Sequence, residues 1–107
     1  MNALVRSRMK EHAYRSHVKQ RMKERFGIDL GRADLEAIRA FILSGQAVEV
    51  LGDCGGRSMW HMNVAGHDVV VVFDLATSTP VTILSPKMAA QKIAHVEKKR
   101  ARVVQSP

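Results

Sequence analysis

The sequence has little cysteine and no long apolar run. A single cysteine, Cys54, excludes an internal disulfide framework. No apolar run reaches the roughly 18 residues that a transmembrane helix needs, so none is predicted. The opening residues, MNALVRSRMK, lack the apolar core of a signal peptide. We therefore expect a cytoplasmic protein. Cys54 stands in a predicted loop, as either an ordinary cysteine or a nucleophile.

Acidic residues are scarce at both ends of the chain. Residues 1–25 hold eight Lys/Arg against two Asp/Glu, and residues 87–107 hold six against one. Residues 26–86 reverse the balance, with three basic and seven acidic side chains. Two basic ends folded onto one side of a domain attract phosphate, whereas separate basic ends are simply solvated helix faces. A pI near 10.2 in so small a chain favours RNA or another polyanion as a partner.

Proline and glycine are missing from residues 3–25, which predicts a long helix. An apolar residue recurs at every fourth position, at Tyr14, Val18, Met22 and Phe26. This spacing predicts one buried stripe. Gly27 is expected to end the helix. The segment before Tyr14 is less regular, so residues 1–13 are interpreted as a possible N-terminal arm.

A second helix is predicted to begin near Asp34, whose side chain is expected to cap it. Its apolar stripe comprises Leu35, Ile38, Phe41 and Ile42. Ser44-Gly45 should end it. A first strand is then expected over Gln46–Leu51, followed by a flexible turn at residues 52–56.

The stretch from His67 to Ser85 predicts a central β-hairpin. Val69–Phe73 is apolar at every position, which is typical of a strand covered on both faces. Pro80–Leu84 reads as its partner strand, with a turn over residues 75–79. Arg57–Val64 is expected to precede it as a strand that joins the hairpin through Ala65-Gly66.

Ser85-Pro86 is the expected start of a last helix, with Ser85 as its cap. The helix carries a basic end, and residues 103–107 are predicted to fray. Two N-terminal helices, a four-stranded antiparallel sheet and a basic C-terminal helix indicate an α+β fold, with residues 1–107 as one domain.

Metal-free cleavage of RNA is the chemistry that these residue types suit best. It needs a base for the 2′-hydroxyl, an acid for the leaving oxygen and cations for the phosphate. His17 and Arg21 are neighbours on the first helix. Arg57 lies on the second strand, and Thr82 offers a hydroxyl on the last strand. Each also has a plain structural explanation, as a surface polar residue or a strand former.

Further basic residues are predicted to bind nucleic acid without taking part in catalysis. They are Lys19, Lys23, Arg25, His61, Lys98, Lys99 and Arg100. A metal site is not expected, because His61 and His67 have no ligand partner at zinc spacing, and Asp68 and Asp74 stand too far apart. No cofactor is implied.

Residues 17–84 resemble a known group of proteins. The pattern combines His17-Val-Lys-Gln-Arg21, Arg25-Phe-Gly-Ile28, a second helix ending in Ser-Gly, and a last strand Val81-Thr-Ile-Leu84. This is similar to the small bacterial and phage proteins related to RelE, BrnT and colicin-type RNases. The resemblance implies that His17 is the acid or base, Arg21 and Arg57 contact phosphate, and Thr82 supplies an active-site hydroxyl. The chain departs from the pattern by having no tyrosine near the last strand and by adding a basic C-terminal helix.

Three functions are consistent with these observations. The first is a metal-independent, toxin-like endoribonuclease, which could have an antitoxin as its partner. The second is a nucleic-acid-binding protein without catalysis. The third is a phage-type inhibitor that uses its basic charge to bind an acidic host protein. No membrane association is expected.

Overall fold

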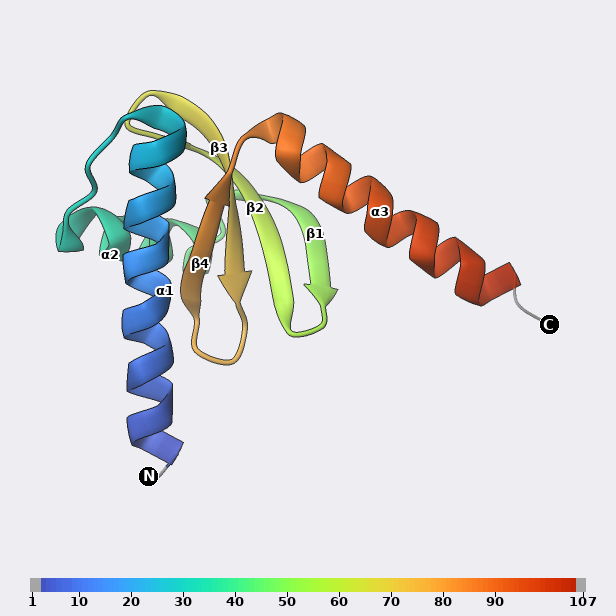
Figure 1. Ribbon diagram of the computed structural model, residues 1–107, viewed down its shortest axis with the longest axis horizontal. Coiled ribbons are helices and arrows are strands. Elements are labelled where there is room, and N and C mark those ends of the chain that lie inside the picture. Colours follow the sequence, from blue (N-terminus) through green and yellow to red (C-terminus); the bar gives the residue numbers. More distant parts are fainter. Residues whose placement is uncertain (1–2, 106–107) are drawn as a thin grey trace.

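The computed structural model describes residues 3–105 of the chain, and within them the predicted α+β architecture is confirmed (Figure 1). The elements follow in the order α1 (Ala3–Phe26), α2 (Arg32–Leu43), β1 (Val48–Cys54), β2 (Arg57–Val64), β3 (His67–Asp74), β4 (Thr79–Leu84) and α3 (Pro86–Gln105). The four strands form one antiparallel sheet in the order β1-β2-β3-β4. Each strand therefore pairs with its neighbour in sequence.

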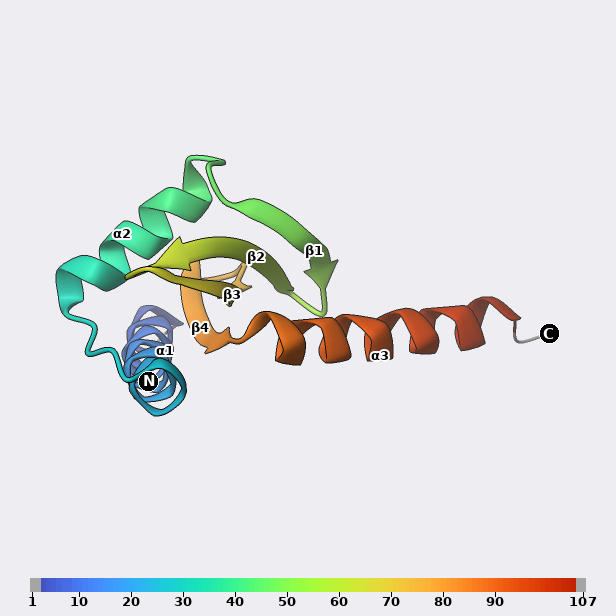
Figure 2. The same cartoon turned by 90° about the horizontal axis from the view of Figure 1, so that it is seen from above.

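The helices occupy three different places around the sheet. Seen from above, α2 lies on one side of the sheet and α3 on the other (Figure 2). The remaining helix, α1, packs against β4, the strand at one border. We refer to the two sides as the α2 face and the α3 face. Since α1 lies along a border, its side chains can reach both.

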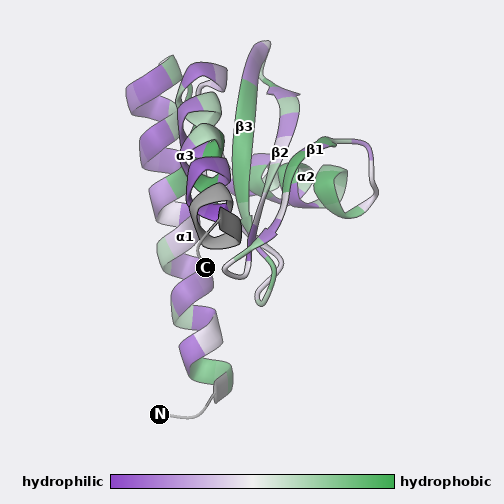
Figure 3. Ribbon diagram, turned by 90° about the vertical axis from the view of Figure 1, so that its right-hand side faces the viewer, coloured by the Kyte–Doolittle hydropathy of each residue, from purple (hydrophilic) through white to green (hydrophobic). Residues whose placement is uncertain are grey.

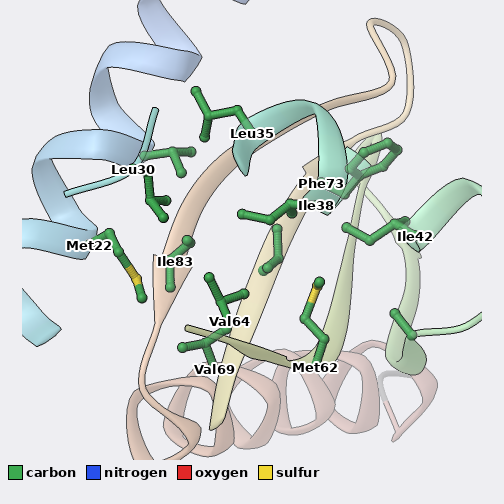
Figure 4. Close-up of a cluster of buried hydrophobic side chains, with 13 residues drawn as sticks. Met22, Leu30, Leu35, Ile38, Ile42, Met62, Val64, Val69, Phe73 and Ile83 are labelled. Atoms are coloured by element: carbon green, nitrogen blue, oxygen red, sulfur yellow. The ribbon is translucent and has the colours of Figure 1, made fainter. Parts of the chain in front are cut away.

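Side chains of β3 alternate between the two faces, which explains its continuous apolar run. Val69 (Figure 4) and Val71 are fully buried in the α2-face core. Val70 and Val72 belong to a second cluster on the α3 face, together with Ala89 of α3. The prediction of a strand covered on both faces is confirmed. Figure 3 shows that β3 is largely hydrophobic, whereas α1 and α3 beside it are mostly hydrophilic.

The predicted stripe of α1 is divided between the two cores. Val18 and Met22 are fully buried in the α2-face core, and Phe26 packs against it. Tyr14 instead packs against the α3-face cluster. The expectation of a single stripe was wrong at this residue, because a helix on the border of a sheet presents one side to each face.

The N-terminal segment is continuous with α1 rather than separate from it. The helix begins at Ala3, so an independent arm over residues 1–13 is not seen among the described residues. The first turns of α1 extend past the end of the sheet (Figure 1). Gly27 ends the helix as predicted, with φ at +69°. A left-handed conformation of this kind is readily adopted by glycine.

Two local predictions need correction. Gly31, not Asp34, is the N-cap of α2, and the Asp34 carboxylate accepts a hydrogen bond from the Gly31 N–H at 2.7 Å. Strand β1 starts two residues later than expected and continues to Cys54, which pairs with Arg57 instead of lying in a loop. Two register shifts let β1 pass through Gly52, so the turn shrinks to residues 55–56.

The turn and the cap that flank the hairpin follow the sequence prediction. Ala65 and Gly66 both have positive φ, +52° and +84°, as a tight two-residue hairpin turn requires. The Ser85 hydroxyl accepts a hydrogen bond from the Met88 N–H at 3.2 Å and caps α3. Helix α3 includes residues 103–105 of the predicted frayed tail, and residues 106–107 lie outside the described chain. Among residues 3–105, no helix has the length and apolar character needed to cross a membrane.

Candidate nucleic-acid site on the α3 face

The candidate site begins on the side of α1 that borders the α3 face. Tyr14, His17 and Arg21 follow at intervals of three and four residues, which places them on one side of the helix. Tyr14 packs against the α3-face cluster, so it orients this side of α1. His17 and Arg21, both half-buried, therefore lie where α1 meets the α3 face.

Arg57 reaches this side of α1 from the first position of β2. Its Nη2 lies 3.4 Å from the Tyr14 hydroxyl, and its guanidinium carbon lies 5.7 Å from the centroid of the Tyr14 ring. A cation over an aromatic face at this distance is attracted by the ring quadrupole. Tyr14 was not among the predicted site residues. Its position three residues before His17 was the signal that would have found it.

The environment of His17 favours its neutral form. Partial burial lowers the pKa of His17 below its usual 6.5, and the charges of Arg21 and Arg25 lower it further, against a smaller opposing effect of Glu24. The imidazole is therefore mainly unprotonated at pH 7. An unprotonated imidazole accepts a proton, which suits a general base.

Arg21 and Arg25 form different contacts. Arg21 Nη1 forms an ion pair with Glu24 Oε2 at 2.7 Å on the same helix. The same contact lowers the pKa of Glu24, together with a hydrogen bond from Gln20. Arg25 Nη1 donates to the Ile83 carbonyl of β4. Arg25, predicted as a nucleic-acid contact, thus joins α1 to β4 and lowers the pKa of His17.

Thr82 faces the α3 side of the sheet because of a bulge in β4. It pairs with Val72, whereas the next residue of β3, Phe73, pairs with Pro80, so Val81 is an extra residue. Val81 packs in the same cluster as Val72. Val81 and Thr82 therefore share the α3 face, although they are neighbours in the sequence. The half-buried Thr82 lies one residue from Ile83, whose carbonyl binds Arg25.

His61 shares the α3 face but lies farther from α1. It pairs with Val70 on one side and with Val48 of β1, at the opposite border of the sheet, on the other. Its Nε2 is 3.9 Å from the Asp68 carboxylate. No described contact joins it to the residues of α1.

The remaining predicted contacts fall into two separate groups. Lys19 lines a cleft with Arg32 and Leu35 of α2, and Lys23 forms an ion pair with Asp29 at 2.8 Å. These two lysines lie on a different side of α1 from His17. Lys98, Lys99 and Arg100 are exposed on α3. The structure therefore gathers Tyr14, His17, Arg21 and Arg25 at the border with β4 and leaves the lysines elsewhere.

No group of three or more histidine, cysteine or acidic side chains among the described residues is placed to hold a metal ion. Neither the protein-family models, nor the curated proteins, nor the solved structures contain a match to this chain.

Proposed function

We propose that the protein is a metal-independent endoribonuclease, with His17 as general base. The observation that supports this best is the half-buried His17, whose pKa is lowered by burial and by Arg21 and Arg25. A neutral imidazole among cations is what a base acting beside a phosphate requires. The resemblance to RelE, BrnT and colicin-type RNases leads to the same reading of His17.

The reaction would be an internal transesterification of RNA. His17 takes the proton of the 2′-hydroxyl, whose oxygen attacks the adjacent phosphorus. The bond to the 5′ oxygen breaks, leaving a 2′,3′-cyclic phosphate and a free 5′-hydroxyl. Arg21 and Arg57 stabilise the added negative charge on the phosphate oxygens, and Thr82 donates a neutral hydrogen bond.

The leaving 5′ oxygen needs a proton, and we assign its donor to Tyr14. The Tyr14 hydroxyl lies on the same side of α1 as His17, and the Arg57 guanidinium contacts it. After one turnover, Tyr14 recovers a proton from His17 through solvent, which restores both groups.

A cleavage assay in EDTA tests the proposal. The native protein, His17→Ala and His12→Ala would be incubated with a labelled oligoribonucleotide and with total RNA. His12 is exposed on the same helix, so His12→Ala controls for the loss of a histidine. We expect His17→Ala to abolish cleavage while its RNA affinity falls little, and His12→Ala to remain active. A parallel collapse of affinity would instead make His17 a binding residue.

Binding of nucleic acid without cleavage is the second candidate. The observation that favours it is that Arg21 and Arg25 already contact Glu24 and Ile83, whereas the basic residues of α3 are exposed. In that case RNA binds in a salt-dependent way and remains intact. A protein without RNA affinity near physiological salt would point to an acidic protein partner.

A further inference from the structure

A second concave surface lies on the α3 face, away from His17. Helix α3 packs on β3 and β4 and then passes β2 on its way out of the domain (Figure 2). The passage leaves an open groove of about 450 Å³, within the usual range for ligand sites. Its lining comprises Met59, Met88, Gln91, Lys92, His95 and Val96.

The groove combines an apolar lining with a positive margin. Met59 and Met88 supply polarizable sulfur, and His95 adds a planar ring. Lys92 brings an ammonium group to the same groove. The charge around it is one-sided, because residues 87–100 of α3 carry five Lys/Arg and one acidic residue, Glu97. A complementary ligand is therefore apolar where it enters the groove and carries negative charge beside it.

We propose that this groove binds an unpaired nucleobase of single-stranded RNA, with an adjacent phosphate on Lys92. The inference rests on the proposed function in taking RNA as the ligand, and it adds a second contact region and the strandedness of the substrate. Bases in a duplex are stacked on each other and do not offer their faces to a protein groove, whereas unpaired bases do. Apolar platforms with nearby cations are typical of single-strand binding.

The position of Met59 connects this groove with the catalytic site. Met59 pairs with Val72, and Val72 pairs with Thr82 on the next strand. Neighbouring strands lie about 4.8 Å apart, so roughly 10 Å of sheet separates the groove floor from Thr82. One RNA strand crossing the α3 face would reach both places. The groove then holds a base beside the cleaved bond.

Binding measurements with matched charge changes test the proposal. Val96→Glu and Gln91→Glu each add a carboxylate to the groove, and Gln91, being exposed, tolerates the change without loss of folding. Ala94→Glu adds the same charge to α3 at an exposed position that does not line the groove. The probes are a labelled single-stranded RNA, a duplex of the same sequence and an abasic strand of the same length. Anisotropy at fixed salt reports each affinity, in the catalytically disabled His17→Ala background.

The native groove should favour the base-bearing single strand over the abasic strand by about fivefold or more, the usual contribution of one stacked base. Gln91→Glu and Val96→Glu should remove this preference. Ala94→Glu should lower the affinity for both strands equally and so keep the preference. Equal affinity for the RNA and the abasic strand would overturn the groove assignment and leave the nuclease proposal intact. Preference for the duplex, or equal effects of all three variants, would also overturn it. So would an acidic peptide that binds in the groove and displaces neither strand. Absence of RNA binding altogether would instead refute the proposed function.

Discussion

Tyr14 and Arg57 touch each other although 43 positions separate them in the chain. The phenol ring lies under the guanidinium, and the hydroxyl lies 3.4 Å from Nη2. Through this pair the first residue of β2 is fastened to α1, one turn of helix away from His17. The contact therefore brings a strand cation to the helix that carries the proposed base.

Replacing Tyr14 with phenylalanine separates its chemical role from its packing role. Tyr14→Phe keeps the ring under Arg57 and loses a long hydrogen bond. The free energy of unfolding, measured with urea, should therefore change by about 1 kcal/mol or less. If the hydroxyl is the acid, the cleavage rate should fall about 100-fold at nearly unchanged RNA affinity. A variant that cleaves at the native rate would remove Tyr14 from the chemistry. Tyr14→Leu, which also loses the ring, should weaken both folding and RNA affinity.

The pH dependence of cleavage should follow the lowered pKa of His17. Since burial and the two arginines lower this pKa below 6.5, the base is active at pH 7 and loses activity as the pH falls through the lowered pKa. Arg21→Gln removes one cation and frees Glu24, so the pKa should rise and the acidic loss of activity should begin at a higher pH. Lys19→Gln, with the same charge change on another side of α1, should shift it less. NMR titration of the His17 ring measures the shift without relying on catalysis.

The same pKa direction has a consequence for folding. The unfolded chain binds a proton at His17 more readily than the folded one does, so stability is full above pH 6.5 and declines as the pH falls through the lowered pKa. His17→Ala should reduce this decline, as measured by urea unfolding between pH 7.5 and pH 5. An unchanged pH profile of stability would contradict the burial of His17.

The two halves of α1 should respond differently to the same mutation. Met22 is fully buried, whereas Met9, in the N-terminal half of the helix, is 55% exposed. Met22→Ala should lower the free energy of unfolding by about 2–5 kcal/mol, because a cavity replaces buried atoms. Met9→Ala should change it by less than about 0.5 kcal/mol. Similar losses in both variants would mean that Met9 is also buried in solution.

The hairpin turn should be stabilised by a better turn residue. Ala65 has φ at +52°, a conformation that alanine adopts at a cost of about 1 kcal/mol and that asparagine tolerates. Ala65→Asn should therefore raise the free energy of unfolding by up to about 1 kcal/mol. Ala76→Asn, an exposed turn position without positive φ, is the control and should be neutral. Thermal unfolding of the two variants decides the comparison.

The sequence predicted the order and type of the elements because their signals are local. The both-sided apolar run Val69–Phe73, the Ala65-Gly66 turn and the Ser85 cap each needed only a few neighbouring residues. What it missed depends on contacts across the chain. The extension of β1 to Cys54 needs pairing with β2, and the bulge at Thr82 is set by pairing with β3. Tyr14 looked like a core residue until the position of α1 on the border of the sheet became known.

The candidate site was predictable in part for the same reason. His17 and Arg21 share a helix, so their spacing alone made them neighbours. Arg57 joins this side of α1 through its contact with Tyr14, which only the fold creates. Lys19 and Lys23 are not part of the site, because the helix turns them toward α2 and the Asp29 loop. The charge of the two lysines alone does not show toward which side of the helix they point.

Analysis of the RNA ends after incubation with the protein in EDTA tests the central claim most directly. The account predicts that the native protein produces 2′,3′-cyclic phosphate and 5′-hydroxyl ends, that a 2′-O-methyl oligonucleotide of the same sequence remains intact, and that His17→Ala produces no cleavage. Intact RNA with the native protein, cleavage of the 2′-O-methyl strand, or an active His17→Ala variant would contradict it.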